Sequence, residues 1–248
     1  MQFLPVGAGA AAREIAAVRR EGDGPDVLFL SGFRSDMDGS KALALDAWAA
    51  RTGRALVRFD YSGHGRSGGR FEDGTIGRWL EESLAVLDGL CRRPVILVGS
   101  SMGGWLALLV ARARRGAAAG LVLVAPAPDF TTRLLEPSLD AEARAALARD
   151  GVWMRPSAYG DGPYPVTRAL IEDSRAHLLL DRPIEVGCPV HILQGVRDEA
   201  VPWSYATELV SKLAGEEVVL TLIKDGDHRL SRPQDVERLI AAVEEIAG

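Results

Sequence analysis

The chain has 248 residues, of which 47% are hydrophobic and 25% charged, with a formal net charge of −5. This length suits one large α/β domain or two small ones, and the composition is ordinary for a globular protein. The 29 Lys and Arg residues are scattered, so we expect no nucleic-acid partner. The two cysteines lack metal-ligand spacing, which indicates free thiols in a reducing compartment.

The first residues of the chain do not have the pattern of a targeting segment. No positive residue precedes their apolar stretch, and Pro5 and Gly7 interrupt it, which argues against a secretory signal. Glu14 and Glu21 argue against a mitochondrial transit peptide, and no apolar run is long enough to span a bilayer. The sequence therefore predicts a cytoplasmic location and no stable insertion into a membrane.

Short apolar runs alternate with helix-like segments along most of the chain. The apolar runs occupy residues 27–30, 55–59, 95–98, 121–124, 190–193 and 218–223, and the helix-like segments include 41–52, 77–90 and 104–115. Continuous apolar strands alternating with helices predict an α/β fold with a mostly parallel sheet covered on both faces. Catalytic groups are then expected in loops at the carboxyl ends of the strands.

The alternation breaks between residues 130 and 185, where prolines and aromatic side chains accumulate. Residues 140–149 and 166–180 look helical inside this segment. Because it is too long for a loop, it predicts a cap inserted over the strand ends. The predicted organisation is a core of residues 1–129 and 186–248 with an inserted cap of residues 130–185. We expect Trp153 and Tyr159 of the cap to contact the substrate, or else to seal the cap onto the sheet.

The most informative motif is Gly99-Ser-Ser101-Met-Gly103, which joins an apolar run to a helix-like segment. This is the G-x-S-x-G pattern of a nucleophile elbow, with Ser101 at the apex of a tight strand-to-helix turn. The glycines remove side chains that would clash there, and the helix N-terminus directs free N–H groups toward charge that forms beside Ser101. Ser101 is the predicted nucleophile, and an idle serine in a glycine-rich turn is the alternative.

A serine nucleophile needs a base and an acid that orients the base, in the chain order Ser, acid, His for this arrangement. His228 follows the last apolar run and is the predicted base. Asp198 follows the run before it and is the predicted acid. Glu199 and Asp227 are neighbouring alternatives, and Asp129, after residues 121–124, is the strongest rival acid.

The other three histidines have weaker patterns. His191 lies inside a strand pattern and is expected in the core, and His177 lies in a helical pattern of the cap and is expected to be structural. His64 belongs to the glycine loop Asp60-Tyr-Ser-Gly-His-Gly-Arg-Ser67. We interpret the glycines as turn residues, and His64 is an alternative contact for the substrate.

An oxyanion hole requires two backbone donors near the nucleophile. The N–H of Met102 is the first candidate, and the N–H of Phe33, after residues 27–30, is the second, since Gly32 allows close approach. An ordinary strand-end turn at Phe33 is the alternative. No His, Cys and carboxylate cluster has metal-ligand spacing, so we expect no metal and no other cofactor.

These residues resemble the α/β-hydrolase superfamily, and within it the mitochondrial palmitoyl-protein thioesterases that also hydrolyse mycophenolic acid acyl-glucuronide, with their bacterial relatives. The resemblance is carried by Gly32-Phe33, Gly39-Ser-Lys41-Ala-Leu-Ala, Arg58-Phe-Asp-Tyr-Ser-Gly63, Leu97-Val-Gly-Ser-Ser-Met-Gly-Gly-Trp105, Gly151-Val-Trp153, Val201-Pro-Trp203 and Asp227-His228-Arg229. It implies an α/β-hydrolase fold with a helical cap and a triad of Ser101, Asp198 and His228. Much of the cap diverges from the family pattern, and the cap is where acyl and leaving-group preferences are set.

The leading interpretation is a serine hydrolase of the carboxylesterase or acyl-protein thioesterase type, which cleaves esters or thioesters through an acyl-enzyme. Its partner would be a small-molecule or S-acylated substrate. Acyl transfer to an alcohol or amine would use the same residues. A non-catalytic ligand-binding protein of the same fold is a further alternative, which the complete Ser, Asp and His set disfavours.

Overall fold

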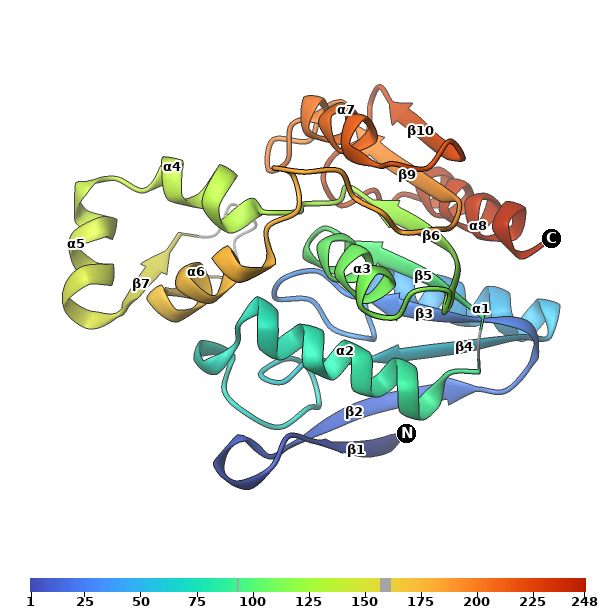
Figure 1. Cartoon of the computed structure of the whole chain (residues 1–248), viewed down its shortest axis with the longest axis horizontal. Coiled ribbons are helices and arrows are strands. Elements are labelled where there is room, and N and C mark those ends of the chain that lie inside the picture. Colours follow the sequence, from blue (N-terminus) through green and yellow to red (C-terminus); the bar gives the residue numbers. More distant parts are fainter. Residues whose placement is uncertain (93, 157–161) are drawn as a thin grey trace.

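The computed structural model describes residues 1–92, 94–156 and 162–248 (Figure 1). In this part of the chain, eight strands form one sheet in the order β1-β2-β4-β3-β5-β6-β9-β10. Their bounds are β1 Gln2–Val6, β2 Arg13–Arg20, β3 Asp23–Leu30, β4 Arg54–Phe59, β5 Val95–Ser100, β6 Ala118–Val124, β9 Val190–Gly195 and β10 Val218–Ile223. Strand β2 pairs antiparallel with β1 and with β4. The remaining pairs of this sheet, β4-β3, β3-β5, β5-β6, β6-β9 and β9-β10, are parallel.

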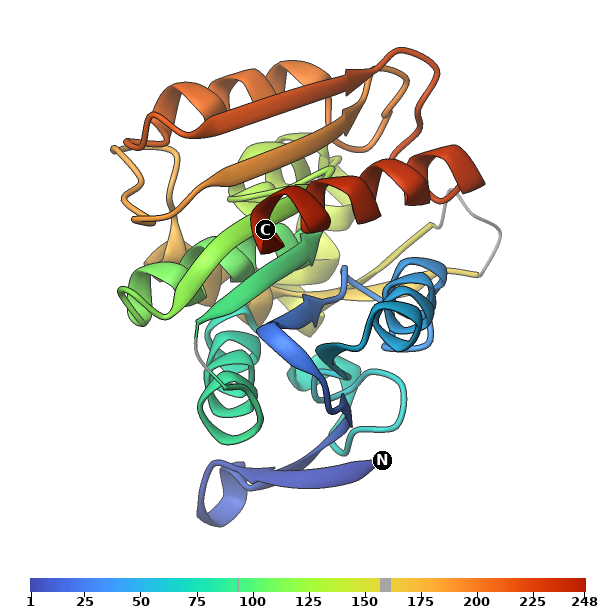
Figure 2. The same ribbon diagram turned by 90° about the vertical axis from the view of Figure 1, so that its right-hand side faces the viewer.

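Helices cover both faces of this sheet, as Figure 2 shows in the view along its edge. One face carries α2 (Ile76–Leu90), α3 (Met102–Ala113) and α7 (Trp203–Lys212), and the other carries α1 (Ser40–Thr52) and α8 (Pro233–Ala247). Successive residues of β5 alternate between the two cores: Leu97 packs under α3, and Val98 packs on the side of α1 and α8. Since both faces are buried, these strands are continuously apolar. The predicted mostly parallel α/β sheet is confirmed.

The sequence pattern did not predict the first two strands. Strand β1 exposes most of its residues and contains Pro5, which is tolerated because the strand lies at the edge of the sheet. Strand β2 ends in Arg19 and Arg20, which form ion pairs with Asp26 and Asp46. The exposed edge strand β1, and β2 with charged residues at both ends of a short apolar stretch, lack the continuous apolar run by which the buried strands are recognised.

The segment between β6 and β9 contains α4 (Glu136–Ser138), α5 (Ala141–Asp150), β7 (Val152–Arg155), β8 (Tyr164–Thr167) and α6 (Arg168–Ser174), flanked by a π-helical turn at Thr131–Leu135 and a 3₁₀ turn at Arg175–His177. It projects to one side of the sheet and has its own small apolar cluster, which includes Leu139, Leu147 and Ile171 (Figure 1). The helix predicted at 140–149 is present. The helix predicted at 166–180 is wrong at both ends, because residues 164–167 pair with β7 in a hairpin and α6 ends at Ser174, followed only by the 3₁₀ turn.

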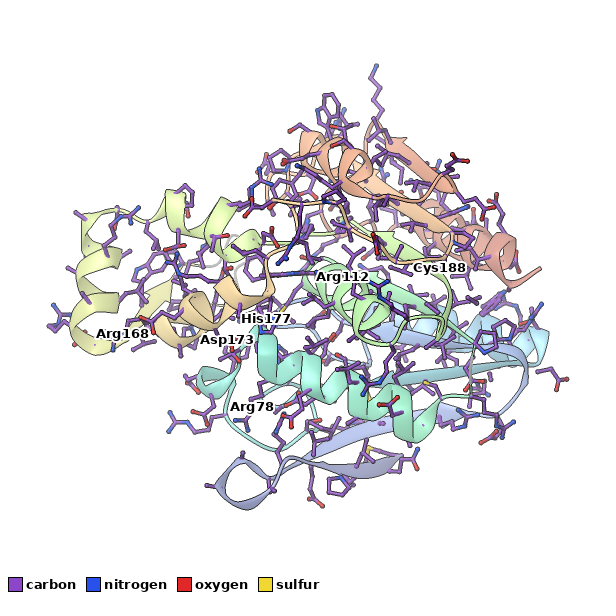
Figure 3. The ribbon with its side chains drawn as sticks, in the orientation of Figure 1. Arg78, Arg112, Arg168, Asp173, His177 and Cys188 are labelled. Atoms are coloured by element: carbon purple, nitrogen blue, oxygen red, sulfur yellow. The ribbon has the colours of Figure 1, made fainter. Side chains whose placement is uncertain are left out.

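The 130–185 segment docks on the N-terminus of α2. The Asp173 carboxylate accepts a hydrogen bond of 2.7 Å from the Gly77 N–H, and His177 lies 3.7 Å from the same carboxylate. Figure 3 shows Asp173 and His177 side by side at this junction. A carboxylate is favoured there because the first N–H groups of a helix are unpaired and carry partial positive charge. The division of the chain into core and cap stays a prediction.

Candidate active site

Ser101 occupies the turn between β5 and α3 in a strained conformation, with φ 54° and ψ −116°. A non-glycine residue is held in this region only when its surroundings fix the backbone. Here the Ser101 N–H donates to the Val124 carbonyl at 2.9 Å, and the Ser101 carbonyl accepts from Gly104 and Ala127 at 2.9 and 3.1 Å. The backbone of the elbow is therefore fixed on both sides of the serine.

The two glycines of the motif allow backbone segments to touch. A Cβ on Gly99 would lie 2.3 Å from the Gly103 carbonyl oxygen, and a Cβ on Gly103 would lie 2.0 Å from the Leu30 carbonyl oxygen. Both distances are far inside van der Waals contact, and the neighbouring atoms are backbone. The glycines thus bring the first turn of α3 against the end of β3.

His228 lies between Ser101 and Asp198. Its Nε2 is 3.0 Å from Ser101 Oγ, and its Nδ1 is 2.7 Å from Asp198 Oδ2. Because Asp198 is acceptor-only when ionised, Nδ1 carries the hydrogen, and Nε2 is left as the acceptor for the serine hydroxyl. The structure therefore brings together the three residues that the sequence singled out, from three separate loops.

Asp198 is enclosed by hydrogen-bond donors, and its side chain has no exposed surface. Its Oδ1 accepts from the N–H groups of Ala200 and Val201 at 2.9 and 2.8 Å. Its Oδ2 accepts from Gln194 Nε2 at 3.0 Å, in addition to His228. Several donors of this kind hold a buried carboxylate in one orientation. Gln194, at the end of β9, was not singled out by sequence, since a buried amide in a strand has no motif of its own.

The loop that carries His228 is attached to α1. Lys41 Nζ donates to the Arg229 carbonyl at 2.6 Å, and Asp227 Oδ1 accepts from the Leu230 N–H at 3.0 Å. Burial lowers the pKa of Lys41 to about 8. Lys41 thus connects the first turn of α1 to the residue after the histidine, a contact that sequence spacing could not reveal.

The rival acids lie elsewhere. Asp129, with 1% of its surface exposed, accepts hydrogen bonds from the N–H groups of Leu179 and Leu180 at 2.8–3.0 Å. Burial raises the pKa of its carboxyl group. Asp227 closes its own turn, and Glu199 is exposed to solvent. The carboxylate of Asp198 is the one that contacts the His228 ring.

The loop after β3 lies against the elbow. A Cβ on Gly32 would stand 3.3 Å from the Ser100 carbonyl oxygen and 3.5 Å from Ser101 Cβ. Among the described residues, neither the Phe33 N–H nor the Met102 N–H donates a hydrogen bond within the protein. Both predicted oxyanion donors are therefore uncommitted, on segments in contact with Ser101.

Aromatic rings extend from this loop into the 130–185 segment. The Phe33 ring lies 5.9 Å from the ring of Phe130 and 6.0 Å from that of Tyr164, and Phe130 lies 5.8 Å from Trp105. Trp153 is half-buried and packs against the apolar cluster of its own segment. Tyr159, the second predicted substrate contact, lies outside the described residues.

The remaining histidines are not at Ser101. His191 is buried in β9, and His177 faces Asp173 as described above. His64 is buried behind the loop after β3, with 6% of its surface exposed. Among the described residues there is no group of three His, Cys, Asp or Glu side chains that could hold a metal ion. Likewise, none of the described helices combines the length and apolar character needed to cross a membrane.

Comparison with known proteins gives the family. Residues 27–241 match the model of the alpha/beta hydrolase family. The chain belongs to this family. It is 36% identical over 233 residues to human palmitoyl-protein thioesterase ABHD10, mitochondrial, covering 94% of this chain and 76% of the relative. The predicted resemblance is confirmed, and the chain is an enzyme of the hydrolase class.

Two solved structures are similar over nearly the whole chain. A hydrolase described as putative, from Agrobacterium vitis S4, is 50% identical with a TM-score of 0.96, covering 100% of this chain and 98% of that one. Alpha/beta hydrolase domain-containing protein 10 from mouse is 34% identical with a TM-score of 0.89, covering 99% of this chain and 98% of that one. The predicted α/β-hydrolase fold is thereby confirmed.

The predicted cytoplasmic location is wrong. The curated relatives at 36% identity, from cattle and from human, are named as mitochondrial proteins. The prediction rested on the charges and prolines of the first residues of the chain. These residues form β1 and β2, so their pattern reflects pairing in the sheet and carries no information about cellular location.

Gly103→Ala tests the close approach of α3 to β3. The new methyl group would meet the backbone oxygens of Leu30 and Ser31, so we expect the free energy of unfolding to fall by about 1–3 kcal/mol, measured by urea denaturation. Gly215→Ala is the matched control, since a Cβ there meets nothing within 4 Å, and it should change stability by less than about 0.5 kcal/mol. Equal stability of the two variants would contradict the steric argument.

Proposed function

We propose that this hydrolase cleaves carboxylic esters or acyl thioesters through an acyl-enzyme, with Ser101 as nucleophile, His228 as base and Asp198 as the acid that orients it. The observation that carries the proposal is the unbroken line of hydrogen bonds from Asp198 Oδ2 to His228 Nδ1 and from His228 Nε2 to Ser101 Oγ. Such a line is the general arrangement for activating a serine hydroxyl.

In the first half of the reaction, Ser101 Oγ attacks the carbonyl carbon while His228 Nε2 takes the hydroxyl proton. Asp198 stabilises the imidazolium that results. The tetrahedral intermediate then breaks its bond to the alkoxide or thiolate, which leaves with the proton from His228. In the second half, water attacks the acyl carbon and His228 takes its proton. The second tetrahedral intermediate then breaks its bond to Ser101 Oγ, which takes the proton back from His228 as the acid leaves.

The negative oxygen of each tetrahedral intermediate needs donors that are already in place. We assign this role to the N–H groups of Phe33 and Met102, which lie on the two segments that meet at Ser101. This assignment is supported by the fact that neither N–H group donates a hydrogen bond to another described residue. The dipole of α3 adds to this stabilisation, because Met102 is its first residue.

The substrate class is supported by the relatives. The human relative is named a palmitoyl-protein thioesterase, and the triad treats an oxygen ester and a thioester by the same steps. We therefore propose acyl thioesters, including S-acylated proteins, together with small carboxylic esters. Residues 130–185 act as a cap that covers the acyl group.

The acyl group is proposed to lie beneath the face of the β7–β8 hairpin that carries Trp153. Trp153 pairs with Val166, and Arg155 pairs with Tyr164, so these four side chains share one face. The Tyr164 ring on this face lies 6.0 Å from that of Phe33. Met154 points to the opposite face and is 51% exposed.

Ser101→Ala should abolish hydrolysis of p-nitrophenyl butyrate and labelling by a fluorophosphonate probe, with a loss in kcat on the order of 10⁵–10⁶. The thermal midpoint should stay near that of the wild type. Ser100→Ala, the adjacent serine in the same motif, is the control and should keep its labelling. Labelling of Ser101→Ala with more than about a tenth of the activity would contradict the proposal.

Asp198→Asn should lower kcat by roughly 10³–10⁴, because the amide no longer holds the correct tautomer of His228. Asp227→Asn and Glu199→Gln should have far smaller effects on the same ester. If Asp129→Asn slowed the reaction more than Asp198→Asn, the acid would have to be reassigned to the end of β6.

Trp153→Ala should change kcat/KM selectively with acyl length when esters from acetyl to palmitoyl are compared. Each methylene that loses its contact is worth about 0.8 kcal/mol, or roughly fourfold. Met154→Ala, on the other face of the hairpin, should leave the length profile unchanged. A uniform effect of Trp153→Ala across all lengths would mean that this side chain only stabilises the cap.

A further inference from the structure

The glycine loop at residues 60–67 has no role in the reaction described above, yet its fold is tightly determined. Asp60 Oδ2 accepts from the Arg66 N–H at 2.8 Å, and Ser67 Oγ donates to the Asp60 carbonyl at 2.6 Å. A Cβ on Gly65 would lie 2.2 Å from Asp60 Oδ2, so only glycine fits there. The loop wraps around the Asp60 carboxylate, and this wrapping places His64.

This loop contacts the loop after β3 at two backbone amides. Asp60 Oδ1 accepts from the Met37 N–H at 2.7 Å, and His64 Nε2 accepts from the Arg34 N–H at 3.2 Å. Arg34 directly follows Phe33 and has a φ of 59°, a left-handed conformation that disfavours any residue with a side chain. The His64 ring therefore holds the residue at which the oxyanion loop is most strained.

The hydrogen bonds of His64 define its tautomer. Nδ1 lies 3.2 Å from the Ser62 carbonyl oxygen, which is only an acceptor, so Nδ1 carries the hydrogen. Nε2 then has a free lone pair for the Arg34 N–H. The ring is enclosed by Phe71, Trp79 and Tyr61, with centroids 5.0, 5.3 and 5.8 Å away.

Electrostatics favours the same neutral form. Burial lowers the pKa of His64 to about 4, and Asp36 is the acidic group that opposes this shift. A protonated ring would point an N–H at the N–H of Arg34, so the contact exists only with the neutral ring. His64 is consequently not a candidate proton carrier for the reaction, since its Nε2 lone pair is occupied by the Arg34 N–H.

We propose that His64 is a positioning residue for the oxyanion hole: through the Arg34 amide it fixes the Phe33–Arg34 peptide, and this restrains the backbone angles of Phe33 that set the direction of the Phe33 N–H on the preceding Gly32–Phe33 peptide. This inference rests on the proposed function, since it assumes that Phe33 stabilises the oxyanion. A donor in an oxyanion hole acts only when it lies about 2.7–3.1 Å from the developing charge, so a small change in the backbone angles of Phe33 is costly.

The test compares three substitutions of His64 with one control. His64→Phe keeps a ring among the aromatic neighbours but removes both hydrogen bonds. His64→Gln can present its Oε1 near the position of Nε2 and accept from Arg34, whereas His64→Asn can replace only the donor to Ser62. Ser67→Ala is the control, because Ser67 stabilises the same loop through Asp60 and Ala16 without contacting the oxyanion loop.

We expect His64→Phe and His64→Asn to lower kcat for p-nitrophenyl butyrate by about 10- to 100-fold with KM changed less than about threefold. His64→Gln should recover most of kcat, and Ser67→Ala should keep it. Affinity for a trifluoromethyl ketone analogue, whose adduct with serine places a negative oxygen in the oxyanion hole, should fall in parallel with kcat/KM. Affinity for butyrate, the product acid, should not change.

Equal kcat in the wild type and His64→Phe would overturn the inference, and so would losses in His64→Gln as large as those in His64→Asn. If His64→Phe fails to fold, the comparison of His64→Gln with His64→Asn decides the question in the same way. Failure of the proposed function is separate: the wild-type enzyme would then not be labelled at Ser101 by the fluorophosphonate probe, whatever the behaviour of His64.

Discussion

The contact between the first turn of α3 and the end of β3 determines the geometry of the whole site. Gly103 has no room for even a methyl group against the Leu30 carbonyl, and Gly32 lies directly against Ser101. The strands that lead into this contact, β3 and β5, are buried, parallel neighbours in the sheet. Ser101 and the loop that carries Phe33 are thus held in a fixed relation by backbone packing.

The loops around this contact are each held by a buried or partly buried polar side chain from outside the reacting set. Gln194 holds Asp198, Lys41 holds the loop of His228, and His64 holds Arg34 beside Phe33. Such supporting contacts position groups to within the fraction of an ångström that catalysis requires. Each of these contacts acts on a loop at the end of a strand, so it positions the loop without altering the packing of the sheet.

Much of this arrangement is encoded locally and could be predicted from the sequence. The strands β3, β5 and β6 are buried on both faces, so they are continuous apolar runs. Of the elbow glycines, Gly99 is required by a contact with Gly103 in the same motif, whereas Gly103 is required by the Leu30 carbonyl, distant in the sequence, and was recognised only through the motif. The pairing of β1 with β2 and of β7 with β8 was missed, because β1, β7 and β8 are short and partly exposed and the apolar stretch of β2 is bounded by charged residues. The contact of His64 with Arg34 joins residues 30 positions apart, and the glycines around His64 indicate only a turn.

Asp129 brings the two ends of the 130–185 segment together, since its carboxylate binds the N–H groups of Leu179 and Leu180. The chain that leaves the sheet after β6 is therefore joined to itself near residue 180, before it reaches β9. A segment whose two ends are held together in this way can be lengthened with little loss of stability, because doubling the length of a flexible loop costs only about 0.6 kcal/mol of closure entropy. One buried carboxylate thus allows residues 130–185 to change in length and sequence while the strands of the sheet keep theirs.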